Sequence, residues 1–333
     1  MKMIIGKEDT IQFTPEEIDR IRKGLAPWKS MSFACGGWLQ FYMFGVARAI
    51  QARGLERDVT YCGCSAGALT AVGLLVDGDF DSAVQFCKEY CLPKAYGEIS
   101  GLLRLSDYVS KCIDITVRPK YKPLPPGLLH VAVTKLPTLK GEIISKFDDF
   151  DDLKNTLLGS SAAFPFAKLV NRKGQWLIDG GLSIFQPVID DSTITVSPFY
   201  FSDCDIKPSR YVPLWWAFFP PKSSGTVDWL YKLGWDDAMS FFDKCKIPND
   251  STNIRLHLNS INKESHPYDT RGRISMHRFL GYNFNNIAHH YVSFTIDLVL
   301  LLLFLFVFKP LALLSIYIEL YMNIFICGIL AII

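Results

Sequence analysis

The sequence predicts an α/β fold built on a mainly parallel sheet, because short apolar runs alternate with segments of helical periodicity along residues 1–205. Two glycine turns, at residues 35–37 and 63–67, each join such a run to a helical segment. The composition agrees: 49% of the residues are hydrophobic and 20% are charged, which excludes a disordered, collagen-like or mainly charged coiled-coil protein.

The elements are expected in a regular order. A helix over residues 15–23 precedes a strand over 31–34, and the helix that follows ends at Gly54, a suitable C-cap. A strand at 59–62 runs into the second glycine turn, and an alanine-rich helix leaves it. The remaining helices are predicted over residues 81–90, 101–113 and 150–158, and the remaining strands over residues 128–133, 143–145, 176–178 and 194–196.

Three segments of different character divide the chain. Residues 1–205 form the predicted α/β core, with its motifs within 30–205, and residues 206–290 form an aromatic-rich extension without an assigned role. We expect most tryptophans of the extension in the core, although they also suit a lipid-facing rim. The four in question are Trp215, Trp216, Trp229 and Trp235.

The third segment, residues 291–333, is a hydrophobic tail. It carries only three charges, on Asp297, Lys309 and Glu319. Residues 311–333 are long enough to span a bilayer, and residues 291–308 reach that length only by including Asp297. The tail therefore predicts C-terminal membrane helices, either a hairpin that turns at Lys309-Pro310 or a single span. A buried helix pair in the core is the remaining alternative.

Charge and cysteine usage exclude several classes of partner. The formal net charge is +2, with no concentrated basic cluster, so no nucleic-acid partner is expected. Nine cysteines are present without a CxxC pair or histidines at zinc-ligand spacing, so we expect reduced, buried thiols and no metal site. The first residues lack the apolar core of a secretory signal.

The segment Gly63-Cys64-Ser65-Ala66-Gly67 is a GxSxG motif. An apolar strand runs into it and a helix leaves it, which is the context of a nucleophile elbow. Glycines two positions on either side of the serine leave room for a sharp turn. Backbone N–H groups at the start of the helix favour the negative charge that develops during acyl transfer. We therefore predict Ser65 as a nucleophile.

A nucleophilic serine needs a base. Among the six histidines, His266 is the best loop candidate, but it has no evident acidic partner. Asp179 ends a predicted strand and is followed by Gly180-Gly181, which exposes its carboxylate at a sharp turn. In a dry site such a carboxylate becomes more basic than its reference pKa of about 3.9. A third element, Cys35-Gly36-Gly37, follows a strand and offers N–H groups for an oxyanion.

The order of a glycine turn, GxSxG and Asp-Gly-Gly resembles the patatin-like phospholipase family, and is most similar to the branch of adipose triglyceride lipase. The stretches GCSAGALTA at 63–71, IDGGL at 178–182 and ITVSPF at 194–199 support the resemblance, which covers roughly residues 30–205. It implies a three-layer sandwich around the sheet, a Ser65–Asp179 dyad, oxyanion donors at Gly36 and Gly37, and no metal or cofactor. Cys35 and Gln40 depart from the family's glycine-rich pattern.

These observations predict a lipid acyl hydrolase that releases fatty acid from a glycerolipid, as a triacylglycerol lipase or as a phospholipase A or lysophospholipase. Its partners would be the lipid substrate, a membrane or lipid-droplet surface and a possible protein activator. We expect an anchored protein at the endoplasmic reticulum membrane or the lipid droplet, with its catalytic domain in the cytosol. The alternatives are a non-catalytic lipid-surface binding or regulatory protein with the same fold, and an acyltransferase.

Overall fold

The computed structural model describes residues 14–98, 100–245 and 247. By its contacts the chain divides into two compact units. The first comprises residues 1–212 and 216–267 and contains the sheet. Of the second, residues 213–215 and 268–333, only Pro213–Trp215 are described.

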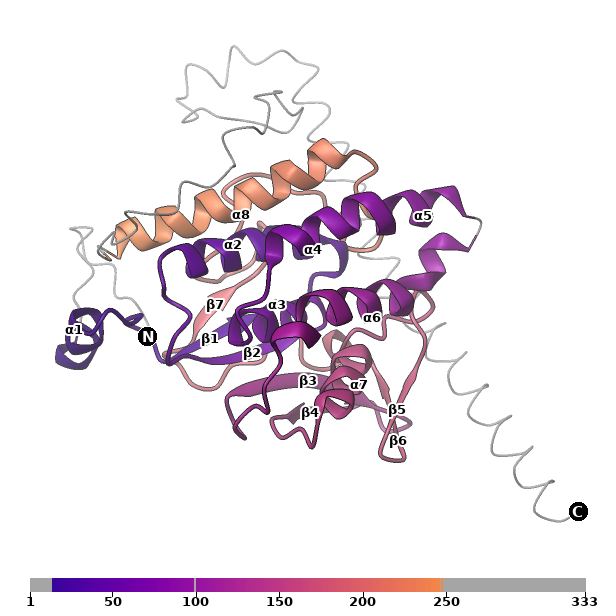
Figure 1. The fold of residues 1–333 in the computed structure, drawn as a ribbon, viewed down its shortest axis with the longest axis horizontal. Coiled ribbons are helices and arrows are strands. Elements are labelled where there is room, and N and C mark those ends of the chain that lie inside the picture. The colour runs from indigo at the N-terminus through magenta and orange to yellow at the C-terminus, as the bar shows by residue number, and fades with distance from the viewer. Residues whose placement is uncertain (1–13, 99, 246, 248–333) are drawn as a thin grey trace, which may run out of the picture. The chain divides into compact units, whose positions relative to one another are not determined.

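A seven-stranded mixed sheet forms the centre of the first unit (Figure 1). Six strands follow the order β5-β6-β3-β2-β1-β7, and β4 pairs with β3 off this path. Strands β7, β1, β2 and β3 are parallel, whereas β4 and β6 run antiparallel to β3, and β5 runs antiparallel to β6. The expectation of a mainly parallel sheet thus holds only for one half, because two hairpins complete the other. The strands are β1 (Ser30–Phe33), β2 (Thr60–Cys64), β3 (Leu129–Lys135), β4 (Lys140–Ile144), β5 (Val170–Arg172), β6 (Gln175–Ile178) and β7 (Ile194–Val196).

The predicted helices lie close to their expected positions, with two differences, and the structure adds α5 and α8, which were not predicted. The helix expected over 81–90 changes to a π-helical turn at Cys87–Cys91, and the one expected over 101–113 begins with a 3-10 turn, Gly101–Arg104. The α-helices are α1 (Pro15–Arg22), α2 (Gln40–Ala52), α3 (Ala66–Leu75), α4 (Phe80–Phe86), α5 (Leu92–Gly97), α6 (Leu105–Thr116), α7 (Phe150–Ser160) and α8 (Ser224–Lys244). Further 3-10 turns are Gly37–Leu39, Arg118–Lys120, Gly180–Leu182 and Leu214–Ala217.

Helices α3 and α7 pack directly against the sheet, α2 packs on α3, and α8 packs on α2. Over β1 and β2 the other face is covered by extended chain instead of a helix. There the backbone oxygen of Pro187 accepts hydrogen bonds from Ser32 Oγ and Cys62 Sγ. These contacts differ from the predicted three-layer sandwich of helices around the sheet, because helices cover one face and, over these two strands, a loop covers the other.

Helix α8 comes from the segment that the sequence left unassigned, and it meets α2 at two glycines. A Cβ on Gly45 would lie 1.9 Å from the backbone oxygen of Tyr231, and one on Gly234 would lie 1.9 Å from that of Tyr42. Only hydrogen atoms fit at both places, so the two backbones touch. Of the four tryptophans considered above, Trp216 is buried as predicted and the others are partly buried.

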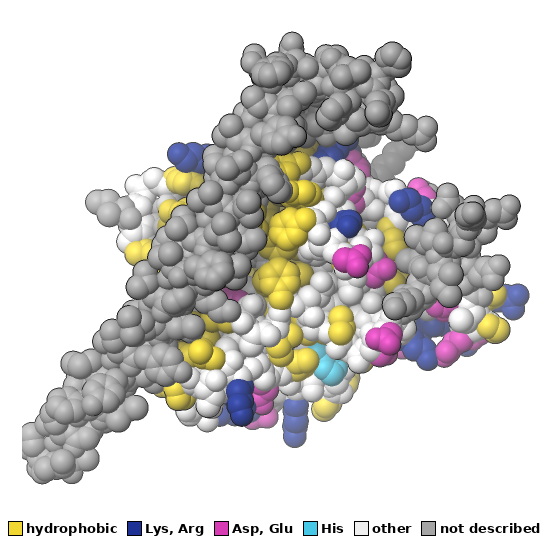
Figure 2. Space-filling model, turned by 180° about the vertical axis from the view of Figure 1, so that it is seen from behind, with side chains coloured by type: hydrophobic (Ala, Val, Ile, Leu, Met, Phe, Trp, Pro, Cys, Tyr) yellow, Lys and Arg dark blue, Asp and Glu magenta, His cyan; other side chains and the backbone are white. Residues whose placement is uncertain are grey.

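Apolar side chains also reach the surface. Figure 2 shows them gathered along one face, with acidic and basic side chains beside them. Several exposed large apolar residues belong to the chain that follows β6 and β7. These are Phe185, Val188, Ile189 and Phe201, with 42–58% of each residue exposed.

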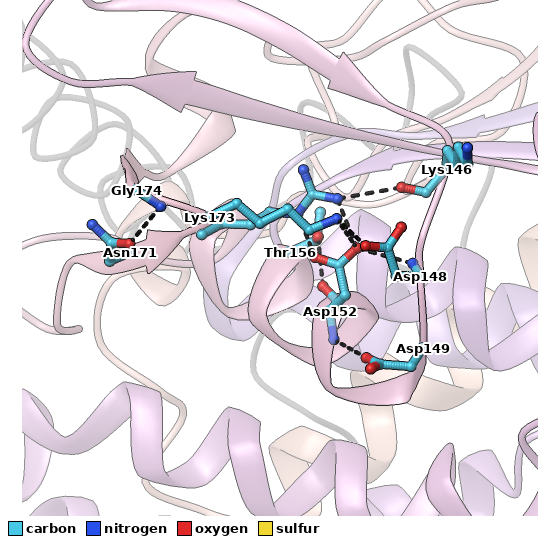
Figure 3. A network of polar contacts seen from close by, with 9 residues as sticks. Lys146, Asp148, Asp149, Asp152, Thr156, Asn171, Lys173 and Gly174 are labelled. Carbon is cyan, nitrogen blue, oxygen red and sulfur yellow. Dashed lines mark hydrogen bonds and ion pairs between the residues drawn. The ribbon is translucent and has the colours of Figure 1, made fainter.

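A buried ion-pair network fixes the start of α7 to the β5–β6 hairpin (Figure 3). Asp152, only 8% exposed, binds Arg172 through both carboxylate oxygens at 2.8 and 2.9 Å and also accepts from Lys173 at 3.0 Å. Burial raises the pKa of Asp152, but the hydrogen bonds from Arg172, the backbone of Asp148 and Lys173 outweigh it and leave the pKa below its ordinary value. The network therefore links the start of α7 to the end of β5 and the turn that follows it.

The predicted tail, residues 291–333, and the candidate histidine His266 lie outside the described residues. Within the part of the chain that is described, no helix combines the length and the hydrophobicity needed to cross a bilayer.

Candidate active site

Ser65 occupies a strained turn between β2 and α3. Its backbone has φ 53° and ψ −124°, a conformation that L-residues rarely adopt. A Cβ on Gly63 would lie 2.5 Å from the carbonyl carbon of Gly67, and one on Gly67 would lie 2.3 Å from the backbone oxygen of Phe33. Both positions thus require glycine, and the strand–turn–helix context predicted for the motif is confirmed.

Asp179 reaches the same place from the opposite direction. Strand β4 occupies one edge of β3, so β2 and β6 share the other edge. The parallel strand β2 ends opposite Ala132, and the antiparallel strand β6 ends opposite Thr134. The two chains therefore approach end to end, and the next residue of each, Ser65 and Asp179, arrives beside Val133. This explains why an aspartate after an antiparallel strand meets a serine after a parallel one.

The Asp179 carboxyl group lies close to two donors. Its Oδ1 accepts a hydrogen bond from the backbone N–H of Gly181 at 2.8 Å, and the Ser65 side chain is near enough to lower the pKa of the carboxyl group. Burial raises the pKa of Asp179 to about 6, although both donors act to lower it. The group is therefore mostly ionised at neutral pH and a stronger base than an aspartate in water, which suits general-base catalysis.

Two backbone hydrogen bonds hold these residues to the C-terminal end of α7. The N–H of Ser65 donates to Ser160 Oγ at 2.8 Å, and Ser160 Oγ donates to the backbone oxygen of Ala132 at 2.7 Å. The N–H of Asp179 donates to the backbone oxygen of Ala162 at 3.2 Å. Sequence analysis did not find Ser160, because a serine inside a helix carries no pattern that indicates such a contact.

The Asp179 backbone is held from a second side. Thr134 Oγ1, on β3, donates to the backbone oxygen of Asp179 at 2.8 Å and also bonds to Ser183 Oγ at 2.7 Å. A Cβ on Gly180 would lie 2.2 Å from the backbone oxygen of Ala132, so the turn after Asp179 packs directly against β3. A Cβ on Gly181 would lie 3.0 Å from both Asp179 Oδ1 and Cys35 Sγ, so close packing explains both glycines of the Asp-Gly-Gly motif.

The glycine turn lies between β1 and α2, as predicted. Gly37 has φ 52°, and a Cβ there would lie 2.0 Å from the backbone oxygen of Ala217. Gly36 lies against Pro198 and Met43, where a Cβ would approach to 2.8–3.0 Å. Among the described residues, the N–H groups of Gly36 and Gly37 donate to no protein acceptor. An oxyanion hole requires N–H groups that are available in this way. Gln40 begins α2 with ordinary helical dihedrals.

Of the six histidines, only His130 lies among the described residues. His130 lies on β3, where its Nε2 bonds to the backbone oxygen of Gly127 at 2.9 Å. Within the described ranges no group of three or more His, Cys, Asp or Glu side chains is arranged to hold a metal ion.

A row of aromatic rings lies next to the glycine turn. The backbone oxygen of Phe185 accepts from the N–H of Cys35 at 2.9 Å. The ring of Phe185 lies 5.5 Å from that of Phe199, which lies 5.7 Å from that of Phe201. The first and last of these residues are about half exposed. Apolar surface is thus available beside the predicted oxyanion donors.

Fold and site together define an α/β protein that carries a serine on a nucleophile elbow, with an aspartate beside it. The chain belongs to the patatin-like phospholipase family. The model of that family, Patatin-like phospholipase, matches residues 31–190. The human "Patatin-like phospholipase domain-containing protein 4" is 30% identical over 246 residues, which are 65% of this chain and 96% of that protein. The predicted family is confirmed, and membership supports lipid hydrolase activity in general terms.

Other similarities are more partial. The mouse and human proteins named "1-acylglycerol-3-phosphate O-acyltransferase" Pnpla3 and PNPLA3 are each 31% identical, over 54% of this chain. This chain spans 45% and 39% of their respective lengths. The solved structure of VipD from Legionella pneumophila is 15% identical, with a TM-score of 0.37, and covers 65% of this chain and 67% of that one. That score is too low to support an argument.

Proposed function

We propose that the protein is a serine acyl hydrolase of lipid esters that uses a Ser65–Asp179 dyad. The observation that carries the proposal is the end-to-end meeting of β2 and β6, which brings the serine hydroxyl to a carboxyl group with a pKa of about 6. A hydroxyl beside a carboxylate base, on an elbow with the N–H groups of a glycine turn nearby, is the arrangement that nucleophilic acyl transfer needs.

In the first half of the proposed reaction, Asp179 takes the proton from Ser65 Oγ as the oxygen attacks the ester carbonyl. The N–H groups of Gly36 and Gly37 stabilise the oxyanion, with help from the N-terminus of α3. The leaving alcohol receives the proton from Asp179, and a serine acyl ester remains. In the second half, water loses a proton to Asp179 and attacks the acyl ester, which releases the fatty acid and restores Ser65.

The proposed substrate is a glycerolipid, either triacylglycerol or phospholipid, presented at a membrane or lipid-droplet surface of the endoplasmic reticulum. The apolar composition of residues 291–333 supports an anchor, and the exposed rings of Phe185 and Phe201 offer apolar surface near the site. A protein activator remains part of the proposal. Protease protection of a tag at Ile333 in intact microsomes distinguishes a single span, which protects the tag, from a hairpin, which exposes it.

The test of the function is fatty-acid release from triolein and from phosphatidylcholine, measured side by side with the purified protein, Ser65→Ala and Asp179→Asn. Release from either lipid that both substitutions abolish supports the dyad and identifies the substrate class. Equal release by Ser65→Ala and the unsubstituted protein contradicts it. A folded protein inactive on both lipids favours the non-catalytic alternative.

Acyl transfer is a second candidate, because two similar proteins are named as 1-acylglycerol-3-phosphate O-acyltransferases. The same acyl-enzyme would then pass its acyl group to a lipid hydroxyl instead of water. Adding 1-acylglycerol-3-phosphate to the assay tests this directly. Phosphatidic acid formed at the expense of free fatty acid, and lost in Ser65→Ala, would indicate transfer.

A further inference from the structure

Two cysteines flank the candidate dyad. Cys64 directly precedes Ser65, and Cys35 directly precedes the first of the two glycines with free N–H groups. Strands β1 and β2 are parallel neighbours with Phe33 opposite Gly63, so Cys35 lies one residue beyond the level of Cys64. Continuing this ladder two residues past Phe33, with strands about 4.8 Å apart and a rise of about 3.3 Å per residue, would place their Cα atoms roughly 6 Å apart. A disulfide requires about 4.4–6.8 Å between Cα atoms.

The side chains of this pair also converge. A Cβ on Gly180 would lie 3.0 Å from Cys64 Sγ, and a Cβ on Gly181 would lie 3.0 Å from Cys35 Sγ. The two sulfur atoms therefore lie against two successive residues of one turn. These two glycines lie directly after Asp179, in the turn that holds its carboxyl group.

The two thiols differ in access. Cys35 is partly exposed and Cys64 is fully buried. Burial, together with the Cys35 thiol and the Asp179 carboxylate, raises the pKa of Cys64, so its thiol stays protonated. An oxidant from solvent therefore reaches Cys35 first. The other described cluster of thiols, Cys87, Cys91 and Cys112, has no member that is more than 8% exposed.

We propose that Cys35 and Cys64 form a reversible disulfide in response to a hydroperoxide, and that this bond switches off hydrolysis at Ser65. The effect on hydrolysis rests on the proposed function, whereas the bond itself does not. The Cys35 thiolate attacks the peroxide, breaks its O–O bond and becomes a sulfenic acid, while a proton completes the released alcohol or water. The Cys64 sulfur then attacks the sulfenic sulfur, and its thiol proton leaves with the hydroxyl as water. Two thiols lose two electrons and the peroxide gains them.

The loss of activity follows from where the bond forms. A disulfide of about 2.05 Å brings the two sulfur atoms closer than any non-bonded contact allows. It pulls the glycine turn toward the elbow and removes the N–H groups of Gly36 and Gly37 from their positions. Loss of one oxyanion donor lowers kcat by about 10²–10³ in hydrolases that use one. Reduction by a dithiol restores the free thiols and the original geometry.

The test treats the purified full-length protein with hydrogen peroxide, followed by dithiothreitol. Free and oxidised cysteines are labelled with light and heavy iodoacetamide before and after reduction, and each cysteine is assigned by peptide mass spectrometry. Hydrolysis of a p-nitrophenyl ester is measured on the same samples. The variants are Cys35→Ser, Cys64→Ala and the control Cys62→Ala, whose thiol lies two residues earlier on β2 and bonds to Pro187.

We expect peroxide to link Cys35 to Cys64 in the unsubstituted protein and in Cys62→Ala, and to lower the hydrolysis rate at least about tenfold, reversibly. In Cys35→Ser and Cys64→Ala the rate of ester hydrolysis should be nearly the same before and after peroxide treatment. Peroxide that oxidises other thiols without forming this link overturns the inference, and so does a link that leaves the rate unchanged. A reduced protein with no hydrolysis refutes the proposed function and the switch, while the mass measurement still decides the disulfide.

Discussion

Replacing Ser160 by alanine should weaken both the fold and the catalytic turn. Ser160 Oγ accepts from the N–H of Ser65 at 2.8 Å and donates to the backbone oxygen of Ala132 at 2.7 Å, and it is fully buried. Alanine leaves two buried backbone groups without a partner, each at about 1–3 kcal/mol. We therefore expect Ser160→Ala to lower the free energy of unfolding by about 2–4 kcal/mol.

The same change should lower kcat with little effect on KM. The backbone of Ser65 is held at φ 53°, a conformation that costs about 1–3 kcal/mol to maintain. Without the bond from Ser160 the turn relaxes, and a misplaced nucleophile lowers kcat by about tenfold to a hundredfold.

The neighbouring residue supplies a matched control. Ser161 is also buried, at 5% exposure, but its hydroxyl has no hydrogen-bond partner in the described part of the molecule. Ser161→Ala removes a hydroxyl without a hydrogen-bond partner, so it should leave the free energy of unfolding and kcat nearly unchanged. Urea unfolding followed by tryptophan fluorescence, with ester hydrolysis in parallel, compares the two variants. Equal effects of the two substitutions, or a change below about 0.5 kcal/mol in Ser160→Ala, would refute the reasoning.

Three further predictions concern pH and packing. Because Asp179 must be ionised to act as a base, kcat/KM should rise with pH and reach half its maximum near pH 6, the pKa of this carboxyl; a flat profile between pH 5 and about 8 would exclude it as the base. Since that pKa lies above the ordinary aspartate value of about 3.9, the charged form is destabilised in the fold, and Asp179→Asn should raise the free energy of unfolding at pH 7 by up to about 3 kcal/mol. The gain should disappear below about pH 3, where the carboxyl is protonated in both the folded and the unfolded state, and denaturant titrations at pH 7 and about pH 3 test this. Gly234→Ala should lower the melting temperature, because the added methyl group would separate α8 from α2. Gly225→Ala is the control: a Cβ there meets only Ser223 Oγ at 3.5 Å, so the melting temperature should stay unchanged or rise. Similar shifts of the two variants in thermal scans would contradict this packing.

The sequence was informative where chemistry depends on adjacent residues. The GxSxG motif, the Asp-Gly-Gly motif and the first glycine turn each lie within a few residues, and their strand and helix contexts follow from local patterns. The glycines of the elbow confirm this, because Gly63 and Gly67 lie against backbone atoms that leave no room for a Cβ.

Features that depend on residues far apart in the chain were not predictable. The contact between Ser160 and Ser65 joins residues 95 positions apart, and no pattern around either indicates it. The reversal of β6 relative to β3 was missed because an apolar strand reads the same in either direction. Helix α8 was missed because its burial depends on two glycines that meet across separate helices, Gly45 and Gly234.

The central claim is that Ser65 is a nucleophile activated by Asp179. Its most direct test is the intact mass of the protein after reaction with a fluorophosphonate at pH 8. We expect one adduct on Ser65, a much slower reaction in Asp179→Asn, and no adduct on that peptide in Ser65→Ala. An unlabelled folded protein, or an adduct of equal rate in Asp179→Asn, would contradict the account.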